Sequence, residues 1–92
     1  MTLSSTALRA KITALAKINE INVVRTSAQY IKYELYYIIT VRIDNGKNRL
    51  SLQETAKLDT ILRECKVDFT IMSIHNRSKV YPPRIRYKIK HT

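Results

Sequence analysis

The most regular alternation of apolar and polar positions covers residues 30–43, with the sequence YIKYELYYIITVRI. From position 31 onward every odd residue is apolar: Ile31, Tyr33, Leu35, Tyr37, Ile39, Val41 and Ile43. A period of two is typical of a β-strand, which turns successive side chains to opposite faces. The pattern therefore predicts a central strand over this stretch, with one wholly apolar face, Leu35 included, buried in the core.

The even positions of the same stretch predict a second, mixed face. Lys32, Glu34 and Arg42 are charged, and Tyr36 and Ile38 lie between them. For Ile38 alone, a small secondary packing contact is the simplest interpretation. The combination of cations with Tyr36 makes this face the first candidate surface for binding a partner.

Two other segments repeat apolar residues at helical spacing. In the N-terminal segment Ser4 or Ser5 is a candidate N-cap, and we expect the cations off the apolar stripe to face solvent. The stripe consists of Leu8, Ile12, Leu15 and Ile18, and the cations are Arg9, Lys11 and Lys17. This pattern predicts an amphipathic helix near the N-terminus.

The second helical segment begins with a capping box, in which the Ser51 hydroxyl accepts from the Glu54 N–H and the Glu54 side chain reaches back. The stripe that follows consists of Leu58, Ile61, Leu62 and Cys65. Cys65 is the only cysteine, which excludes an internal disulfide and fits a reducing compartment. Its place on the stripe favours a buried core residue over a reactive nucleophile.

Short β-branched or alternating runs at residues 21–26, 67–71 and 84–90 predict three further strands. Pro82 and Pro83 cannot donate to a ladder, which limits their region to a sheet edge or to the start of a strand. Together with the helices, these runs predict a single domain over residues 1–92. Its class is α+β and its order αββαββ, with two helices on one face of an antiparallel sheet.

The amino-acid composition and net charge limit the kinds of partner that the protein could bind. The 92-residue chain has a net charge of +10, from 17 Lys and Arg against seven Asp and Glu, and its 45% hydrophobic content excludes a disordered polycation. A folded, strongly cationic domain favours a polyanionic partner, either nucleic acid or an acidic protein surface. No apolar run approaches the ~20 residues that span a bilayer. We therefore expect a soluble, intracellular protein with no membrane partner.

The chain offers little for catalysis. Its single glycine excludes the glycine-rich loops that bring the backbone close to a phosphate. His75 and His91, with Cys65 as the only thiol, have the spacing of neither a zinc site nor a Cys–His pair. The acidic residues are scattered singly. We expect no enzyme activity, no metal, no cofactor and no small-molecule substrate.

The strongest positive signal is a row of cations two residues apart on the last strand, at intervals of roughly 6.6–6.8 Å. That interval is close to the phosphate spacing of an extended single strand, and cations beside an aromatic ring are typical of single-strand binding. The competing interpretation is an edge strand kept cationic against aggregation, for which one or two lysines suffice. The candidate partner-binding residues are Lys32, Tyr36, Arg42, Arg77, Lys79, Arg84, Arg86, Lys88 and Lys90.

Three stretches carry a resemblance to a known group of proteins: the opening MTLSSTALRAKITALAKINEINVV, the tyrosine-rich YIKYELYYIITVRI and the basic end PPRIRYKIKHT. The chain resembles the small phage anti-CRISPR proteins of the type I-F group. These proteins share neither motif nor fold, so the resemblance assigns no residue a role. It implies a non-enzymatic inhibitor that binds the RNA-guided Cas surveillance complex in the cytoplasm of the infected bacterium and blocks target DNA recognition.

The net charge constrains how such an inhibitor would work. A protein at +10 cannot imitate DNA, so it should bind the guide RNA or an acidic Cas surface beside it and compete with target DNA. The alternative is a stand-alone small basic protein that binds DNA or RNA and regulates genes. A helix-turn-helix is disfavoured, because a predicted hairpin separates the two helices.

Overall fold

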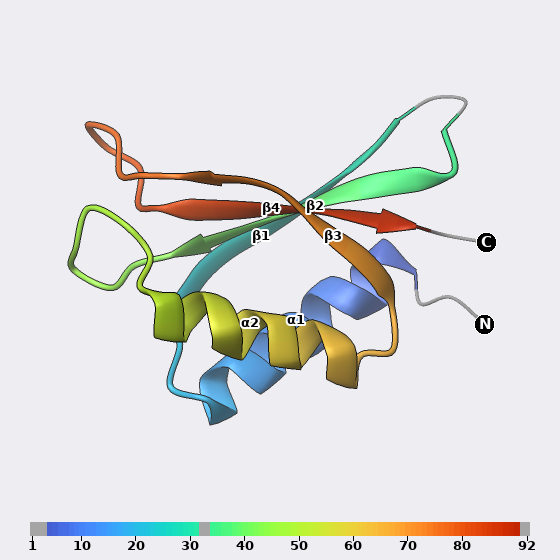
Figure 1. The fold of residues 1–92 in the computed structure, drawn as a ribbon, viewed down its shortest axis with the longest axis horizontal. Coiled ribbons are helices and arrows are strands. Elements are labelled where there is room, and N and C mark those ends of the chain that lie inside the picture. The colour runs from blue at the N-terminus through green and yellow to red at the C-terminus, as the bar shows by residue number, and fades with distance from the viewer. Residues whose placement is uncertain (1–3, 32–33, 91–92) are drawn as a thin grey trace.

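The computed structural model describes residues 4–31 and 34–90 of the chain. The predicted α+β class and the order αββαββ are confirmed, and both helices lie on the same side of the sheet (Figure 1). In chain order the elements are α1 (Ser5–Ile18), β1 (Val23–Tyr30), β2 (Tyr36–Ile43), α2 (Leu52–Glu64), β3 (Asp68–His75) and β4 (Arg84–Lys90).

The four strands form one antiparallel sheet in the order β1-β2-β4-β3. The last strand of the chain, β4, is therefore a central strand, with β2 on one side and β3 on the other. Pro82 and Pro83 precede it, and the Pro83 carbonyl accepts a hydrogen bond of 3.0 Å from the Ile43 N–H. Of the two positions that the prolines allowed, the start of a strand is the one found.

The core lies between the helices and one face of the two central strands. Every second residue of β2 and β4 points into it and is at most 1% exposed: Tyr37, Ile39, Val41, Ile43, Ile85, Tyr87 and Ile89. The helices cover these side chains with Leu8, Ile12, Ala16, Leu58, Ile61, Leu62 and Cys65. Phe69 of β3 closes one side, with its ring edge-on to Tyr87 at a centroid distance of 5.8 Å. The apolar stripe predicted for α2 is thus buried as expected.

Both helices begin at the serines that the sequence indicates. The Ser4 hydroxyl accepts from the Ala7 N–H (3.1 Å) and caps α1. At α2 the capping box is complete: the Glu54 N–H donates to the Ser51 hydroxyl (3.1 Å), and the Ser51 N–H donates to the Glu54 carboxylate (2.9 Å). The side-chain amide of Asn45 donates to the same carboxylate (2.8 Å), which ties the 44–50 loop to the helix.

Two expectations for α1 are wrong. Ile18, predicted on the apolar stripe, is 76% exposed because the helix ends there, and Ala16 takes the inward position instead. Arg9, predicted to face solvent, is half-buried and links α1 to β1. Its guanidinium donates to the Thr26 carbonyl (2.9 Å) and to the Thr26 hydroxyl (3.3 Å). A long side chain beside a stripe can reach a neighbouring strand, which helical spacing alone does not reveal.

The largest departure from the sequence prediction concerns residues 30–35. Tyr30 ends β1, and β2 does not begin until Tyr36, so residues 30–43 are not one strand. The chain reverses between the two strands, where the Glu34 N–H donates to the Ile31 carbonyl (3.1 Å). Leu35 lies outside the core with 71% of its surface exposed. The prediction that Leu35 is buried is therefore wrong.

The sequence prediction was wrong here because the alternation of apolar residues does not stop where β1 ends. It continues through the residues between the two strands and into β2. The predicted strand at residues 21–26 is in fact β1, which extends to Tyr30. The Tyr30 hydroxyl donates to the Ser5 hydroxyl (3.0 Å), and its ring centroid lies 5.1 Å from that of Tyr37. Contacts to residues so distant in the chain are invisible to a local pattern.

The predicted strand at residues 67–71 is longer and irregular in the structure. β3 runs on to His75, and its register with β4 shifts between Ile71 and Ser73. The extra residue, Met72, is 49% exposed. A bulge of this kind changes which residues face the core, so Ile74 shares the core face with Ile71.

Candidate nucleic-acid interface

The face of the sheet turned away from the helices, here called the open face, is built from the alternate residues of all four strands. The strand register brings them side by side: Arg25, Ser27 and Gln29 of β1, Tyr36, Ile38, Thr40 and Arg42 of β2, Arg84, Arg86, Lys88 and Lys90 of β4, and Asp68, Thr70, Ser73 and His75 of β3. Ile38 is buried among them at 5% exposure, apart from the main core. This is the small packing contact that the sequence suggested.

Four predicted binding residues, Arg84, Arg86, Lys88 and Lys90, form the β4 row along the middle of this face. Arg84 and Arg86 are half-buried, whereas Lys88 and Lys90 are exposed. Because β4 is flanked by β2 and β3, the row protects no sheet edge. The competing explanation from the sequence, an edge strand kept cationic, does not apply to this strand.

A second line of basic side chains crosses the sheet at right angles to the β4 row. Arg25, Arg42, Arg84 and His75 occupy directly opposed positions on β1, β2, β4 and β3, and we call them the transverse row. Neighbouring strands are about 4.8 Å apart, and the like charges of the three arginines, which lie directly opposite one another, are destabilising. Within residues 4–31 and 34–90, no carboxylate forms an ion pair with these side chains. This arrangement favours an anionic partner.

Aromatic rings position one cation at each end of the open face. The Arg42 guanidinium carbon lies 4.8 Å from the ring centroid of Tyr81, and the Lys88 Nζ lies 4.1 Å from that of Tyr36. Both distances fall within the range of a cation–π contact. Lys88 thus covers one face of the ring of Tyr36, the predicted stacking residue.

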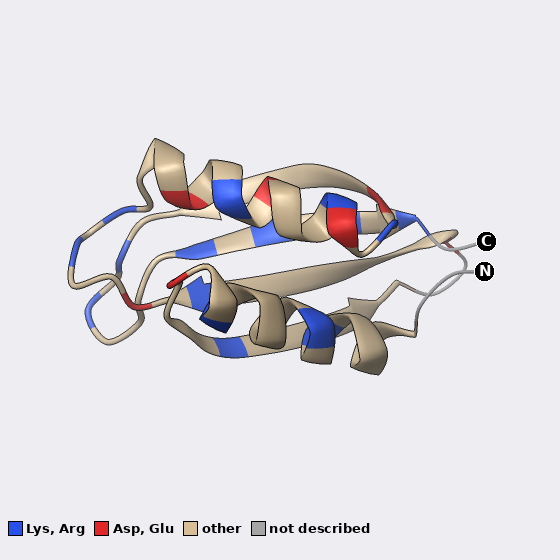
Figure 2. Ribbon diagram, turned by 90° about the horizontal axis from the view of Figure 1, so that it is seen from below, with Lys and Arg blue, Asp and Glu red and all other residues tan. Residues whose placement is uncertain are grey.

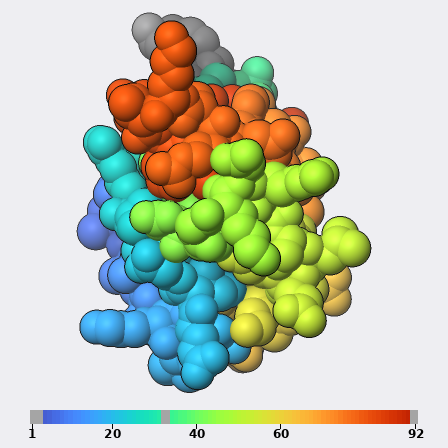
Figure 3. Space-filling view, turned by 90° about the vertical axis from the view of Figure 1, so that its left-hand side faces the viewer, coloured from blue at the N-terminus to red at the C-terminus, as the bar shows by residue number. Residues whose placement is uncertain are grey.

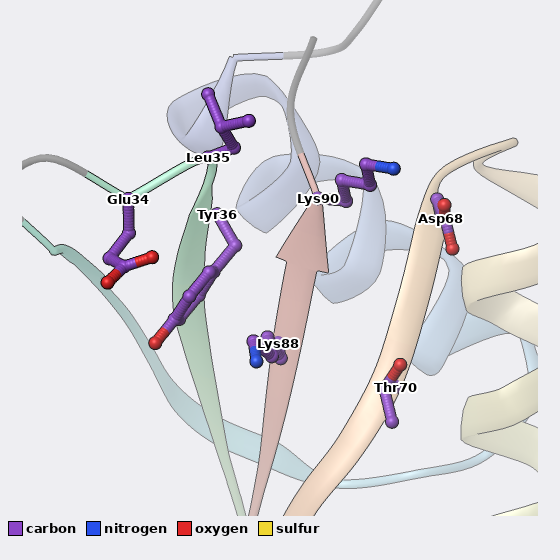
Figure 4. Close-up of a pocket in the computed structure, with 7 residues that line it drawn as sticks. All are labelled: Glu34, Leu35, Tyr36, Asp68, Thr70, Lys88 and Lys90. Carbon is purple, nitrogen blue, oxygen red and sulfur yellow. The ribbon is translucent and has the colours of Figure 1, made fainter.

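The Tyr36 end of the open face is hollowed into a groove of about 620 Å³ (Figure 4). Its lining residues are Glu34, Leu35, Tyr36, Asp68, Thr70, Lys88 and Lys90. Figure 4 shows the Tyr36 ring extended along β2 beside Lys88, and Leu35 turned away from the sheet. Since two carboxylates share this groove with two lysines, it is less cationic than the opposite end of the face.

The opposite end is formed by the loops that follow β2 and β3. The Arg77 N–H donates to the Asn48 carbonyl (2.6 Å), which joins the 76–83 loop to the 44–50 loop. Figure 3 shows the orange surface of the first loop directly above the yellow-green surface of the second. Arg77 and Lys79, both predicted binding residues, are exposed on this loop. Lys32, the remaining predicted residue, lies outside the described residues.

The strands contribute few acidic residues to the open face. Three of the seven acidic residues of the chain, Glu54, Asp59 and Glu64, lie on α2 (Figure 2). On the open face the strands contribute a single carboxylate, that of Asp68 at the start of β3. The net charge of +10 is therefore distributed unevenly, with the open face strongly basic.

The sequence analysis missed three residues of this surface: Arg25, His75 and Tyr81. Arg25 reaches the transverse row because the regular β1–β2 register, which runs from Tyr30 opposite Tyr37, places it opposite Arg42. His75 lies beyond the strand predicted at residues 67–71, and β3 proves to include it. A hairpin prediction with an explicit register would have placed Arg25 beside Arg42. Nothing in the local sequence indicates that Tyr81 packs on that arginine.

Three observations concern metal binding, the cysteine and membrane spans. No group of three His, Cys, Asp or Glu residues that could hold a metal occurs in ranges 4–31 and 34–90. Burial raises the pKa of the Cys65 thiol, with Lys11 opposing and Glu64 adding to the effect, so its thiolate is disfavoured. No helix in the described part of the chain has the length and apolar character needed to cross a membrane.

Comparisons of the chain with protein-family models, with curated proteins and with solved structures found no match.

Proposed function

We propose that this protein is a non-enzymatic inhibitor of the type I-F RNA-guided surveillance complex. It binds the complex near the guide RNA, in the cytoplasm of the infected bacterium, and blocks the recognition and hybridisation of target DNA. The inhibitor acts without a cofactor or a small-molecule substrate. The proposal combines the resemblance of the sequence to type I-F anti-CRISPR proteins with the basic open face.

The observation that carries the proposal is the β4 row on a central strand. Four cations along one strand repel one another, and Arg84 also lies directly opposite Arg42 on the neighbouring strand β2. Neither edge protection nor internal ion pairing within the described residues explains them. An anionic partner would relieve the repulsion, and a nucleic-acid backbone presents anions along a line as the row presents cations.

The charge also favours occlusion over imitation of DNA. With a net charge of +10 and a basic open face, the protein is attracted to phosphates and cannot substitute for them. In an RNA-guided complex the guide is the polyanion that target DNA must reach. A protein about 36 × 27 × 19 Å in extent, seated on that guide, would cover it against hybridisation.

The second candidate function is a stand-alone small basic DNA- or RNA-binding protein that regulates genes. The same open face supports it, because cations that track phosphates serve a free strand as well as a bound guide. The hairpin of β1 and β2 separates α1 from α2, so the described residues contain no helix-turn-helix. This candidate would use the sheet and not a recognition helix.

A DNA challenge tests the proposal. Guide-loaded complex is mixed with rising amounts of the protein, and labelled target DNA is added afterwards. We expect DNA binding to fall linearly to zero at a fixed ratio of protein to complex, with protein and guide RNA chemically intact. Unimpeded DNA loading would overturn the proposed function. If the protein instead retained free nucleic acid from a lysate and left DNA loading unchanged, the regulatory alternative would replace it.

Two triple variants with the same charge loss identify the surface responsible. The first replaces Arg86, Lys88 and Lys90 of the β4 row by Gln, and the second replaces exposed helix cations by Gln: Lys11, Lys17 and Arg63. We expect the first variant to inhibit at least about tenfold less well, because it loses local contacts as well as charge. The second should change inhibition by no more than about threefold, since it alters only the long-range field. Equal losses would show that net charge alone drives binding.

A further inference from the structure

A small pocket lies where the transverse row meets the 76–83 loop. Its volume is about 140 Å³, and Arg42, His75, Asn76, Ser78, Tyr81 and Arg84 line it. That volume is below the roughly 300–1,000 Å³ of pockets that enclose a small-molecule ligand. The pocket is therefore sized for one chemical group of a larger partner.

The charges around the pocket suit an anionic group. Arg42 and Arg84 occupy directly opposed positions on β2 and β4, and His75 lies across from Arg84 on β3. None of the described residues that line the pocket is acidic. The Arg84 Nε has less than 1 Å² of exposed surface and no hydrogen-bond partner among the described residues. A buried guanidinium nitrogen without a partner is unfavourable, and a nearby anion offsets that cost.

Other side chains hold the Arg42 guanidinium and the His75 imidazole and add neutral donors. The Tyr81 ring packs on Arg42 at 4.8 Å from the guanidinium carbon, which limits the directions in which that side chain can turn. The His75 Nε2 lies 3.0 Å from the Ser73 hydroxyl oxygen, so the imidazole is held as well. Asn76 and Ser78 also line the cavity, and both side chains carry hydrogen-bond donors. Paired planar guanidinium groups match the oxygens of a phosphate better than lysines do.

We propose that this pocket binds a phosphate group of a nucleic-acid strand whose backbone follows the β4 row. Arg84 belongs to both features, so a strand tracked by Lys90, Lys88 and Arg86 leads into the pocket. The inference rests on the proposed function, in which the strand is the guide RNA. It adds a phosphate subsite to a row that would otherwise act by charge alone.

The first test uses the free protein and inorganic phosphate, followed through the Nε–Hε NMR signals of the arginines at constant ionic strength. We expect the signals of Arg42 and Arg84 to shift saturably, with Arg9 and Arg63 as internal controls that do not shift. Chloride at the same ionic strength should leave all four unchanged. Absence of a saturable shift at Arg42 and Arg84 would overturn the phosphate site.

The second test compares variants in binding to a six-nucleotide oligouridylate. Arg84→Gln should weaken binding at least tenfold, whereas Lys88→Gln, with the same charge loss on the same row, should weaken it no more than threefold. Arg84→Lys keeps the charge but loses the planar fork, so the Arg42 signal of this variant should lose most of its shift with phosphate. Equal effects of Arg84→Gln and Lys88→Gln would contradict a distinct subsite.

The oligouridylate is prepared with a 5′-phosphate, a 3′-phosphate or hydroxyl ends to identify the source of the phosphate. Tighter binding of one phosphorylated form assigns the pocket to a terminal phosphate, and equal binding assigns it to an internal phosphodiester.

Hexaglutamate is the protein-like competitor. If it shifts Arg42 and Arg84 as tightly as RNA does, the pocket recognises acidic protein and the inference is wrong. Because these measurements omit the surveillance complex, failed inhibition in the DNA challenge would overturn the proposed function alone.

Discussion

The two faces of the central strands β2 and β4 have opposite characters. On the helix side, the alternate residues from Tyr37 to Ile43 and from Ile85 to Ile89 are at most 1% exposed. On the open side, the residues between them include Arg42 and the β4 row, with no ion pair to a carboxylate within the described residues. The same backbone thus carries the core on one face and concentrated positive charge on the other.

The difference between the two faces assigns the stability of the fold to the helix side and the binding of a partner to the open side. Burial of apolar surface on the helix side supplies the driving force for folding. The opposed cations of the open side work against folding, although solvent and salt reduce the effect. Substitutions on the two faces should therefore have opposite consequences: loss of stability on one, and loss of binding without loss of stability on the other.

The largest expected effect is on the core face. Ile39→Ala should lower the free energy of unfolding by roughly 2–5 kcal/mol, because Ile39 is fully buried at the centre of the sheet. Leu35→Ala is the matched control, and it should change stability by less than about 0.5 kcal/mol, since Leu35 is 71% exposed. Urea denaturation measures both. Similar losses for the two variants would contradict the exposed position of Leu35.

A smaller effect is expected where α2 begins over the core. Ser51→Ala should cost about 1 kcal/mol, because the hydroxyl that accepts from the Glu54 N–H is lost. Ser51→Thr keeps an acceptor at the same place and should restore most of that stability. Thermal and urea denaturation of the three proteins decide the matter. A threonine variant as unstable as the alanine variant would show that the cap itself contributes little.

The other half of the capping box predicts a dependence on pH. Burial of the Glu54 carboxyl raises its pKa, but hydrogen bonds from Ser51 and Asn45, with the nearby Lys47, outweigh burial and hold the pKa below its usual value. A lowered pKa in the folded state stabilises the protein above the unfolded pKa of about 4.3, and this contribution is lost as pH falls through the folded pKa.

Glu54→Gln should therefore be less stable than the wild type at pH 7, and the gap should narrow as pH falls from about 5 to 3. Urea midpoints for the two proteins at each pH measure the gap. A gap that stays constant with pH would show that the charge of Glu54 does not stabilise the helix start.

The smallest effect on stability is expected on the open face. Replacing Arg86, Lys88 and Lys90 by Gln should leave the free energy of unfolding within about 0.5 kcal/mol of the wild type, or raise it slightly, because like charges are removed. Thermal denaturation at low salt is the most sensitive condition. A large loss of stability would mean that the row supports the fold, and the separation of the two faces would fail.

The fold was predictable from the sequence where its determinants are local. The capping box at Ser51, the stripe of α2 and the alternation of β4 each lie within a few residues of chain, and all three occur in the structure. Leu35 was predicted wrongly. It does alternate with Tyr37 in the sequence, but it lies before the start of β2, and that start depends on where β1 ends. Local periodicity cannot supply that boundary.

The candidate site was predictable only along one strand. The β4 row could be identified because its spacing is a property of a single segment. The transverse row joins four strands, and Arg25 and His75 enter it through the register of three strand pairs, which for His75 includes the shifted position at Met72. Strand order was equally beyond the local pattern, and it decides that β4 is central.

The central claim is that the open face binds the guide RNA, and affinity for the complex with and without its guide tests it most directly. We expect the protein to bind guide-loaded complex much more tightly than the same Cas subunits without RNA. Contact between the β4 row and about four phosphates should give a log–log salt slope near −3 for the guide-loaded form. Equal affinity for both forms, or a flat salt dependence, would contradict the claim and indicate a purely protein-facing site.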